Sequence, residues 1–219
     1  MTVTTAQLIE GFKQVAIASV ADAVDRLIKR PGFMTYEIKP IFPARIAGPA
    51  VTVLERAALE SRPPEHALQA IDEAPPGAVI VIGMEEPASG RNVAQWGGLM
   101  TAGAAARGLG GAVLDGGARD VVEIREAGFP VFSRTVIPSS TVGRYVTVGL
   151  NIPVVCGGVL VRPGDFIVGG EDGVVVVPQD AAAEVLAEAR AIDATEARMA
   201  QAIGRLRSIR KAVEEFARI

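Results

Sequence analysis

The chain of 219 residues has very few cysteine, histidine and aromatic residues. It has one cysteine, Cys156, and one histidine, His66, and 5% of its residues are aromatic. A single cysteine excludes an internal disulfide framework and fits a reducing compartment. A single histidine argues against a metal site built from several histidines. Because 49% of the residues are hydrophobic and few of these are aromatic, we expect a core of Val, Ile, Leu and Ala.

The chain also has no excess of positive charge and no long apolar run. Its formal net charge is −3, which argues against nucleic acid as the main partner. No apolar run approaches the roughly 20 residues that a membrane span requires. The first ten residues lack the cationic segment followed by an apolar segment that is typical of a secretory signal. We therefore expect a cytoplasmic protein that binds neither nucleic acid nor a membrane.

The pattern of apolar residues predicts alternating helices and strands in the first two thirds of the chain. Helices are predicted at residues 5–28 (one or two helices), 64–73, 98–107 and 120–127. Strands are predicted at residues 45–54, 78–82, 111–114 and from 130 onward. Ser19 followed by Asp22 resembles a helix-capping box. The alternation favours a partly parallel sheet.

Beyond residue 142 the sequence predicts short valine-rich strands and then a helical segment. The strands are at residues 146–148, 154–155, 159–161, 166–168 and 174–177. From residue 180 a charged, alanine-rich segment predicts one long helix or a pair of helices with Gly204 inside. No linker or low-complexity tract divides the chain, so we expect one α/β domain with a mixed sheet and terminal helices. The C-terminal helix is long enough to lie along a neighbouring subunit.

The segment Trp96-Gly97-Gly98-Leu99-Met100 predicts a glycine turn at the start of a helix of small residues. Free N–H groups at the start of a helix favour anions. The same two glycines also fit the ordinary interpretation, which is a tight turn with close packing. The glycine pair alone does not decide between them.

Arg119 and Asp120 follow the predicted strand at residues 111–114 through a predicted Gly-Gly turn. Ligands of α/β proteins usually bind where strands of the sheet end. An aspartate can hold a hard divalent ion, and an arginine can bind a carboxylate or a keto oxygen. Asp120 with Glu123 three residues later also matches a helix-capping pattern, and the spacing alone favours that interpretation.

Other polar residues lie near these segments. Arg134 and residues 139–141 follow a predicted strand, in place to contact a substrate or a neighbouring subunit. We expect Asp115 to order the turn below Arg119. Cys156 is expected in the core. Trp96, beside the glycine turn, is expected to pack, with a place in the pocket wall as the alternative. His66, on a predicted surface helix, is expected to have no functional role.

Several segments taken together resemble the RraA-like family. They are Gly97-Gly98-Leu99-Met100, the Ala-Ala-Ala-Arg-Gly run at 104–108, Asp115-Gly116-Gly117-Ala118-Arg119-Asp120, Glu126-Ala127-Gly128-Phe129-Pro130-Val131-Phe132 and Gly170-Glu171-Asp172-Gly173-Val174-Val175-Val176-Val177-Pro178. That family includes the 4-hydroxy-4-methyl-2-oxoglutarate / 4-carboxy-4-hydroxy-2-oxoadipate aldolases. The resemblance implies an α/β fold of swivelling β/β/α type with mixed sheets. It implies a single domain over residues 1–219, with its core at about 19–178 and a helical segment at 180–218.

The resemblance also implies a site. Arg119 would bind the pyruvoyl part of a substrate, and Asp120 would carry a divalent metal, Mg²⁺ or Mn²⁺, partly through waters. Backbone N–H groups of Gly97, Gly98, Leu99 and Met100 would hold the substrate carboxylate. The family usually forms a homotrimer or hexamer with sites at subunit interfaces. A glutamate from the C-terminal region of a neighbouring subunit takes part, and the sequence does not single one out.

The chain departs from the aldolase pattern at Gly98. The aldolases have an aspartate 21 positions before the arginine, where it orders a metal-linked water for proton transfer. Glu85 and Glu86 are candidates for the missing acid, although two adjacent glutamates in a loop are usually just solvated. The sequence leaves open which group replaces it.

The resemblance and the site chemistry together predict a divalent-metal-dependent lyase that cleaves a small 2-oxo acid to pyruvate through a metal-stabilised enolate. This is the chemistry of a class II 4-hydroxy-2-oxo acid aldolase, of an oxaloacetate decarboxylase, or of both. Decarboxylation requires no base to remove a hydroxyl proton, so the absence of an aspartate at position 98 affects this reaction less than aldol cleavage. The alternative is a non-catalytic regulator that binds an endoribonuclease. Such family members typically lack the acidic residue after the arginine, which is present here as Asp120.

Overall fold

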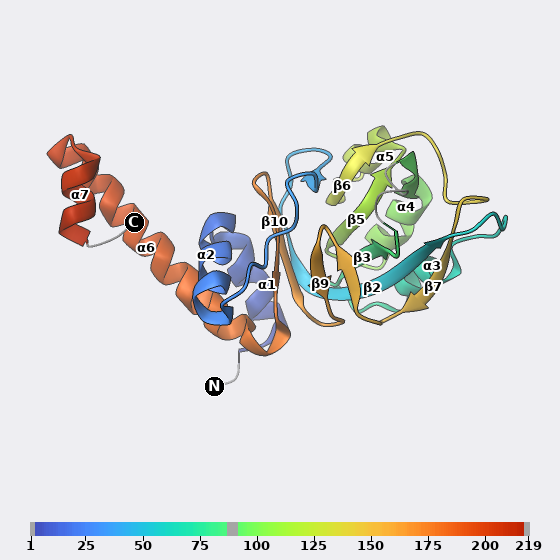
Figure 1. Ribbon diagram of the computed structural model, residues 1–219, viewed down its shortest axis with the longest axis horizontal. Coiled ribbons are helices and arrows are strands. Elements are labelled where there is room, and N and C mark those ends of the chain that lie inside the picture. Colours follow the sequence, from blue (N-terminus) through green and yellow to red (C-terminus); the bar gives the residue numbers. More distant parts are fainter. Residues whose placement is uncertain (1–2, 87–91, 217–219) are drawn as a thin grey trace.

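The computed structural model describes residues 3–86 and 92–216, and in them a mixed sheet forms the centre of the molecule (Figure 1). The strands are β1 (Lys39–Pro40), β2 (Ile46–Ala57), β3 (Val79–Met84), β4 (Ala94–Trp96), β5 (Gly111–Ala118), β6 (Val131–Val136), β7 (Tyr145–Leu150), β8 (Val154–Cys156), β9 (Val159–Val161), β10 (Phe166–Gly170) and β11 (Gly173–Val177). Nine of these described strands form one sheet in the order β1-β6-β5-β3-β2-β10-β11, with β4 beside β5 and β7 beside β2. The strands β8 and β9 form a separate hairpin.

The helices lie in two groups around this sheet (Figure 1). They are α1 (Thr5–Gln14), α2 (Ile17–Ile28), α3 (Glu65–Glu73), α4 (Gly98–Ala106), α5 (Val121–Glu126), α6 (Ala182–Leu206) and α7 (Ile209–Phe216). The helices α1, α2 and α6 share one apolar cluster with β10 and β11. The helix α6 then extends away from the body and carries α7 at its far end.

The parallel strands β2, β3, β5 and β6 are joined in turn by α3, α4 and α5. Every residue of β3 and β5 is buried, as expected for strands covered on both faces. Along β3, Ile80 and Ile82 belong to the cluster that includes α3, α4 and α5. Val79 and Val81 belong to the cluster on the other face, which includes the β8–β9 hairpin. This is the predicted mixed α/β fold with a long C-terminal helix.

The strand β5 is longer than predicted. It continues to Ala118, so Gly116 and Gly117 are strand residues and the predicted Gly-Gly turn is wrong. A Cβ at Gly116 would lie 2.9 Å from Gln95 Oε1, and one at Gly117 would lie 2.8 Å from Ile137 Cγ2. The two glycines therefore allow neighbouring segments to approach this strand closely. As a result, Arg119 follows the end of the strand directly.

One prediction for the helical ends is wrong. Ser19 lies inside α2 and is buried, so it caps no helix. The capping box is instead made by Thr4 and Gln7 at the start of α1. The C-terminal segment is a pair of helices, with Gly204 inside α6 as predicted and the break at Arg207, which has a φ of 49°. Within residues 3–86 and 92–216, no helix combines the length and the apolar character of a membrane span.

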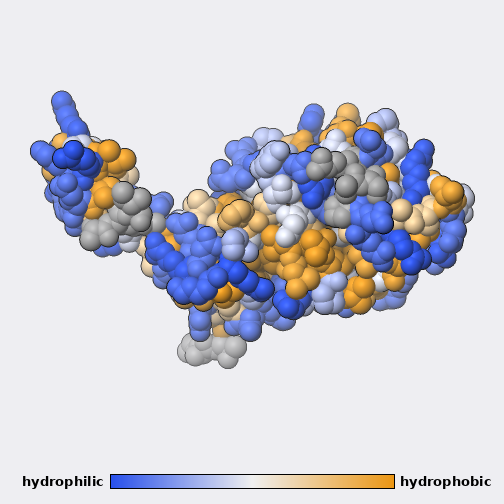
Figure 2. All heavy atoms as spheres, viewed as in Figure 1, coloured by the Kyte–Doolittle hydropathy of each residue, from blue (hydrophilic) through white to orange (hydrophobic). Residues whose placement is uncertain are grey.

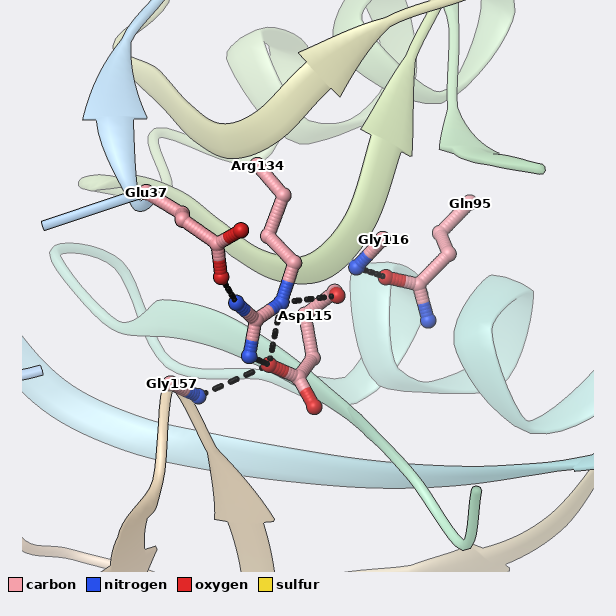
Figure 3. Close-up of polar contacts among 6 residues, drawn as sticks. All are labelled: Glu37, Gln95, Asp115, Gly116, Arg134 and Gly157. Carbon is pink, nitrogen blue, oxygen red and sulfur yellow. Dashed lines mark hydrogen bonds and ion pairs between the residues drawn. The ribbon is translucent and has the colours of Figure 1, made fainter. Parts of the chain in front are cut away.

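A buried carboxyl group lies near the end of β2. Glu55 is fully buried, and its Oε2 accepts a hydrogen bond of 2.9 Å from Gln95 Nε2. Gln95 Oε1 in turn accepts one of 2.6 Å from the Gly116 N–H, which Figure 3 shows. Burial removes the carboxylate from water and raises the pKa of Glu55 from 4.5 to about 7, while the bond from Gln95 lowers it.

This pKa shift predicts how the stability changes with pH. Between about pH 4.5 and 7 the folded state binds this proton more tightly than the unfolded chain, so the free energy of unfolding falls as the pH rises. Glu55→Gln keeps the shape of the protonated acid without its titration. We expect this variant to be more stable than the wild type at pH 8.5, by up to about 3 kcal/mol, and nearly equal to it at pH 4.5.

Urea unfolding at pH 4.5 and pH 8.5 measures this difference. The exposed Glu126→Gln is the matched control, and its stability should follow that of the wild type at both values. An unchanged pH dependence in Glu55→Gln would contradict a raised pKa at Glu55.

Candidate functional site at the ends of two parallel strands

The pairing of β4 with β5 brings the two predicted motifs together. The two strands are parallel, and Trp96 pairs with Ala118 at their carboxyl ends. The chain then enters α4 through Gly97 and α5 through Arg119. The Arg119 N–H donates a hydrogen bond of 3.0 Å to the Trp96 carbonyl oxygen. Two segments more than 20 residues apart in sequence therefore start their helices at the same edge of the sheet.

Asp120 connects the two helix starts. Its Oδ2 accepts a hydrogen bond of 2.9 Å from the Gly98 N–H at the start of α4. Asp120 itself lies in the left-handed region with a φ of 57°, and its side chain makes no capping hydrogen bond to α5. The interpretation of Asp120 as a side-chain cap is therefore wrong. The Gly98 N–H, predicted to hold a substrate carboxylate, is already bonded to Asp120.

Arg119 and Asp120 form a weak ion pair that leaves both groups accessible. Arg119 Nε lies 3.7 Å from Asp120 Oδ2, and the two side chains are 45% and 39% exposed. An ion pair at this exposure contributes little to stability. Both contacts of the Asp120 carboxylate use Oδ2, which leaves Oδ1 available to a further ligand.

A cavity of about 420 Å³ opens beside these residues. All six residues that the sequence predicted for the site line it, namely Gly97, Gly98, Leu99, Met100, Arg119 and Asp120. Further lining residues are Pro64, Leu68, Ala94, Gln95, Trp96, Glu123, Ser140, Thr141 and Val142. Glu123 is the one acidic lining residue that the sequence analysis had assigned only to a capping pattern. Glu123 comes three residues after Asp120, about one helical turn, and this spacing predicts that the two side chains lie on the same side of α5.

The first turn of α4 presents unpaired N–H groups to this cavity. The first hydrogen bond of the helix is donated by the Thr101 N–H to the Gly97 carbonyl oxygen, at 3.0 Å. The N–H groups of Leu99 and Met100 come before it, so the helix offers them no carbonyl partner. Together with Arg119, they make this end of the cavity suited to an anion.

Glycine is required at position 97 by this close arrangement. A Cβ there would lie 2.7 Å from Asp120 Oδ2 and 3.3 Å from both Cγ and Nε of Arg119. Any side chain would therefore push the carboxylate and the guanidinium away from the helix start.

Of the other candidates that the sequence suggested, Ser140 and Thr141 line the cavity, and the rest lie elsewhere. Glu85 and Glu86 follow β3, are exposed and do not line the cavity within the described residues. Ser139 Oγ donates a hydrogen bond of 2.7 Å to the Asn92 carbonyl oxygen. His66 Nδ1 is hydrogen-bonded to Thr147, 3.0 Å from its Oγ1.

Two residues expected in packing roles are buried. Trp96 is 1% exposed, stacks on Phe129 with ring centroids 6.0 Å apart, and donates to Thr101 Oγ1 at 2.9 Å. Cys156 is fully buried, and this burial raises the pKa of its thiol.

Asp115 does not support Arg119 as predicted. Because β5 continues past it, Asp115 lies inside the sheet and is 0% exposed. Its Oδ1 accepts from Arg134 Nη2 at 2.7 Å, from Arg134 Nε at 3.0 Å and from the Gly157 N–H at 2.8 Å. Arg134 also pairs with Glu37 (Figure 3). This network joins β5, β6 and the β8–β9 turn, and Arg134 is committed to it.

Removal of the arginine from this network should destabilise the fold. Arg134→Met leaves Asp115 buried without a cation, and breaking a buried pair in this way costs about 3–5 kcal/mol. We expect that loss in the free energy of unfolding measured in urea. Asp115→Asn in the Arg134→Met background should recover part of it. Arg107→Met, at an exposed position, is the control. A loss below about 1 kcal/mol would contradict the account, since surface substitutions typically have effects of that size.

The donor set suits a hard divalent ion that keeps some of its water. Among the described residues there is no group of three or more His, Cys, Asp or Glu that forms a complete metal cage. Mg²⁺ is usually bound by one or two carboxylates together with waters and substrate oxygens. Asp120, with Glu123 in the same cavity, matches that pattern.

Comparison with known proteins places the chain among relatives of two kinds. A protein of Halalkalibacterium halodurans named as a candidate 4-hydroxy-4-methyl-2-oxoglutarate aldolase is 36% identical over 185 residues, which covers 83% of this chain and 81% of that protein. The crystal structure of an uncharacterized protein from Pseudomonas syringae pv. tomato superposes with a TM-score of 0.83 at 33% identity, covering 97% of this chain and 99% of that one.

Streptomyces coelicolor RraAS2, described as an unusual member of the RNase ES inhibitor RraA protein family, shares the fold. Its TM-score is 0.76 at 24% identity, and the match covers 90% of this chain and 96% of that one. The profile of the RraA-like family, described as Aldolase/RraA, matches residues 17–176. The chain therefore belongs to the RraA-like family.

Proposed function

We propose that this protein is a divalent-metal-dependent lyase that cleaves a small 2-oxo acid to pyruvate. The observation that carries the proposal is the common position of Arg119, Asp120 and the first turn of α4 in one cavity. The identity of 36% to a candidate 2-oxo acid aldolase supports the same reaction class.

The chain's own groups provide binding and charge stabilisation. The N–H groups of Leu99 and Met100 face a substrate carboxylate, and Arg119 donates to a carboxylate or keto oxygen. Asp120, whose Oδ1 takes part in neither the bond from the Gly98 N–H nor the ion pair with Arg119, would hold Mg²⁺ or Mn²⁺. When bound, such an ion supplies Lewis-acid polarisation of the 2-oxo group.

The bond that breaks lies between C3 and C4 of the 2-oxo acid. Its electron pair moves to C3, and negative charge develops on the oxygen at C2, where the guanidinium of Arg119 stabilises it. In aldol cleavage the 4-hydroxyl loses its proton and becomes the carbonyl of the second product, and C3 gains a proton to give pyruvate. In oxaloacetate the leaving group is CO₂, so no hydroxyl proton has to be removed.

The proposal includes an assembly of copies, a homotrimer or a hexamer with the cavity at a subunit contact. Leu99 at the mouth of the cavity is 92% exposed. The arm formed by α6 and α7 stands away from the body, and apolar side chains reach its surface (Figures 1 and 2). Ile209 on α7 is 67% exposed. Ile209 lies with Met199, Ile203 and Val213 along one apolar groove of this arm, and contiguous exposed apolar surface is typical of a face that another chain covers.

A second candidate function is binding to an endoribonuclease. It is favoured by the fold shared with RraAS2. Such binding requires neither a divalent ion nor Asp120, which separates it from the lyase.

The lyase is tested by pyruvate formation followed by NMR, from 4-hydroxy-4-methyl-2-oxoglutarate and from oxaloacetate, with Mg²⁺, with Mn²⁺ and with a chelator. We expect ion-dependent formation that falls by about 100-fold or more in Arg119→Ala and in Asp120→Asn, because each removes a charge acting on the reacting oxygens. The exposed Glu126→Gln is the control. No ion-dependent pyruvate from either substrate would contradict the lyase and favour the regulator.

A further inference from the structure

The cavity beside Arg119 and Asp120 has an apolar wall that the proposed chemistry does not use. This wall consists of Pro64, Leu68 and Val142, of which the last lies in the loop between β6 and β7. Pro64 is the cap residue of α3 and Leu68 lies one turn further along, so the two share a face of the helix. Leu68 and Val142 are each 41% exposed, so the fold leaves part of their apolar surface uncovered.

Hydrogen bonds fix the elements that carry the apolar wall. The helix α3 lies beside β7 (Figure 1), and the His66 N–H in its first turn donates a bond of 3.1 Å to Thr147 Oγ1. In the loop before β7, the Gly143 N–H donates to the Glu60 carbonyl oxygen at 3.2 Å, and Glu60 belongs to the segment that leads into α3. The wall is therefore formed before a ligand binds, which lowers the entropic cost of binding.

The charged residues of the cavity come from other elements than the apolar wall. In the part of the chain that the structure describes, Arg119 is the one cation that lines the cavity. The arginines in the loops next to the wall have other partners. Arg62 pairs with Glu60 at 3.0 Å, and Arg144 donates to a carbonyl oxygen of its own loop at 3.2 Å. A carboxylate placed against the wall would lose water without gaining a cation, which is unfavourable.

The cavity is also larger than a pyruvoyl group requires. Its volume of about 420 Å³ lies within the range of about 300–1,000 Å³ that is typical of sites for drug-sized ligands. A 2-oxo acid held by Arg119 and the start of α4 fills only one end of it. A group beyond C3 of that acid has the apolar wall to pack against, and burial of apolar surface there stabilises the complex.

We propose that the apolar wall binds an uncharged aliphatic group carried by C4 of the substrate. The preferred substrate is then a 4-hydroxy-2-oxo acid with a single carboxylate, and Leu68 and Val142 determine this preference. The inference deepens the proposed function and rests on it. It separates this chain from the relative of Halalkalibacterium halodurans, whose name gives a dicarboxylic acid, 4-hydroxy-4-methyl-2-oxoglutarate, as the substrate.

Two substrates of equal size measure the preference. In 4-hydroxy-4,5-dimethyl-2-oxohexanoate an isopropyl group replaces the second carboxylate of 4-hydroxy-4-methyl-2-oxoglutarate, and aldol cleavage gives pyruvate and 3-methylbutan-2-one. We expect kcat/KM to be higher for the isopropyl compound by about 10-fold or more, as is typical when apolar atoms fill an apolar pocket. Equal values, or a preference for the dicarboxylic acid, would overturn the proposal.

A cation placed in the apolar wall should reverse the preference. Leu68→Lys provides this charge, and lysine is favourable in a helix, so α3 should be retained. Leu59→Lys adds the same charge at a leucine that is 92% exposed and does not line the cavity, and it should keep the wild-type preference. Sedimentation velocity compares the assembly of both variants with that of the wild type. An unchanged preference in Leu68→Lys, with dissociated copies, would show that the wall is a subunit contact and would overturn the proposal.

Analogues that are not cleaved test the apolar wall without turnover. N-isobutyloxamate and N-oxalylglycine have equal numbers of heavy atoms, and only the second carries an additional carboxylate. In calorimetry with Mn²⁺ we expect the isobutyl compound to bind about 10-fold or more tightly, and this order to be reversed in Leu68→Lys. The expected order without pyruvate formation from any of the 2-oxo acids would refute the lyase alone. Pyruvate formation with equal or tighter binding of N-oxalylglycine by the wild type would refute the role of the wall alone.

Discussion

The hydrogen bond from the Gly98 N–H to Asp120 Oδ2 is the contact on which the candidate site depends. It forms because β4 and β5 are parallel and end together, so that α4 and α5 start side by side. The bond fixes the carboxylate at the start of α4 and leaves Oδ1 for a ligand. Arg119 lies next to Asp120, and its backbone N–H donates a hydrogen bond to the Trp96 carbonyl oxygen. Neither motif forms such a site alone, since each contributes only part of the charge and of the backbone donors.

Two buried polar networks hold β5 in the position that this arrangement needs. On one side Asp115 is bonded to Arg134 and to the Gly157 N–H. On the other side Gln95 bonds both Glu55 and the Gly116 N–H. Gln95 also lines the cavity, so one of these networks borders directly on the candidate site. Buried polar groups with few partners favour a single arrangement of the strands, because any shift would leave them unbonded.

The sequence predicted much of the fold, because the small-residue helix at α4, the buried strand β3 and the valine-rich strands have clear apolar patterns. It also predicted Arg119 and Asp120 as neighbours of the α4 start. It did not predict how far β5 extends, since Gly116-Gly117 is a turn signal whose close packing against other segments is visible only in three dimensions. Asp115 was misplaced for that reason. Glu123 fitted a capping pattern, and only the fold brings its carboxylate to the space beside Gly98.

In the function that we propose, Asp120, Arg119 and the start of α4 form one site for a 2-oxo acid and a divalent ion. Oxalate is a planar dianion that resembles the enolate of pyruvate, and its binding can be measured by calorimetry with and without Mn²⁺. The account predicts that Mn²⁺ and oxalate each strengthen the binding of the other, and that Asp120→Asn abolishes this coupling. Oxalate affinity that is the same with and without Mn²⁺, or coupling that persists in Asp120→Asn, would contradict it.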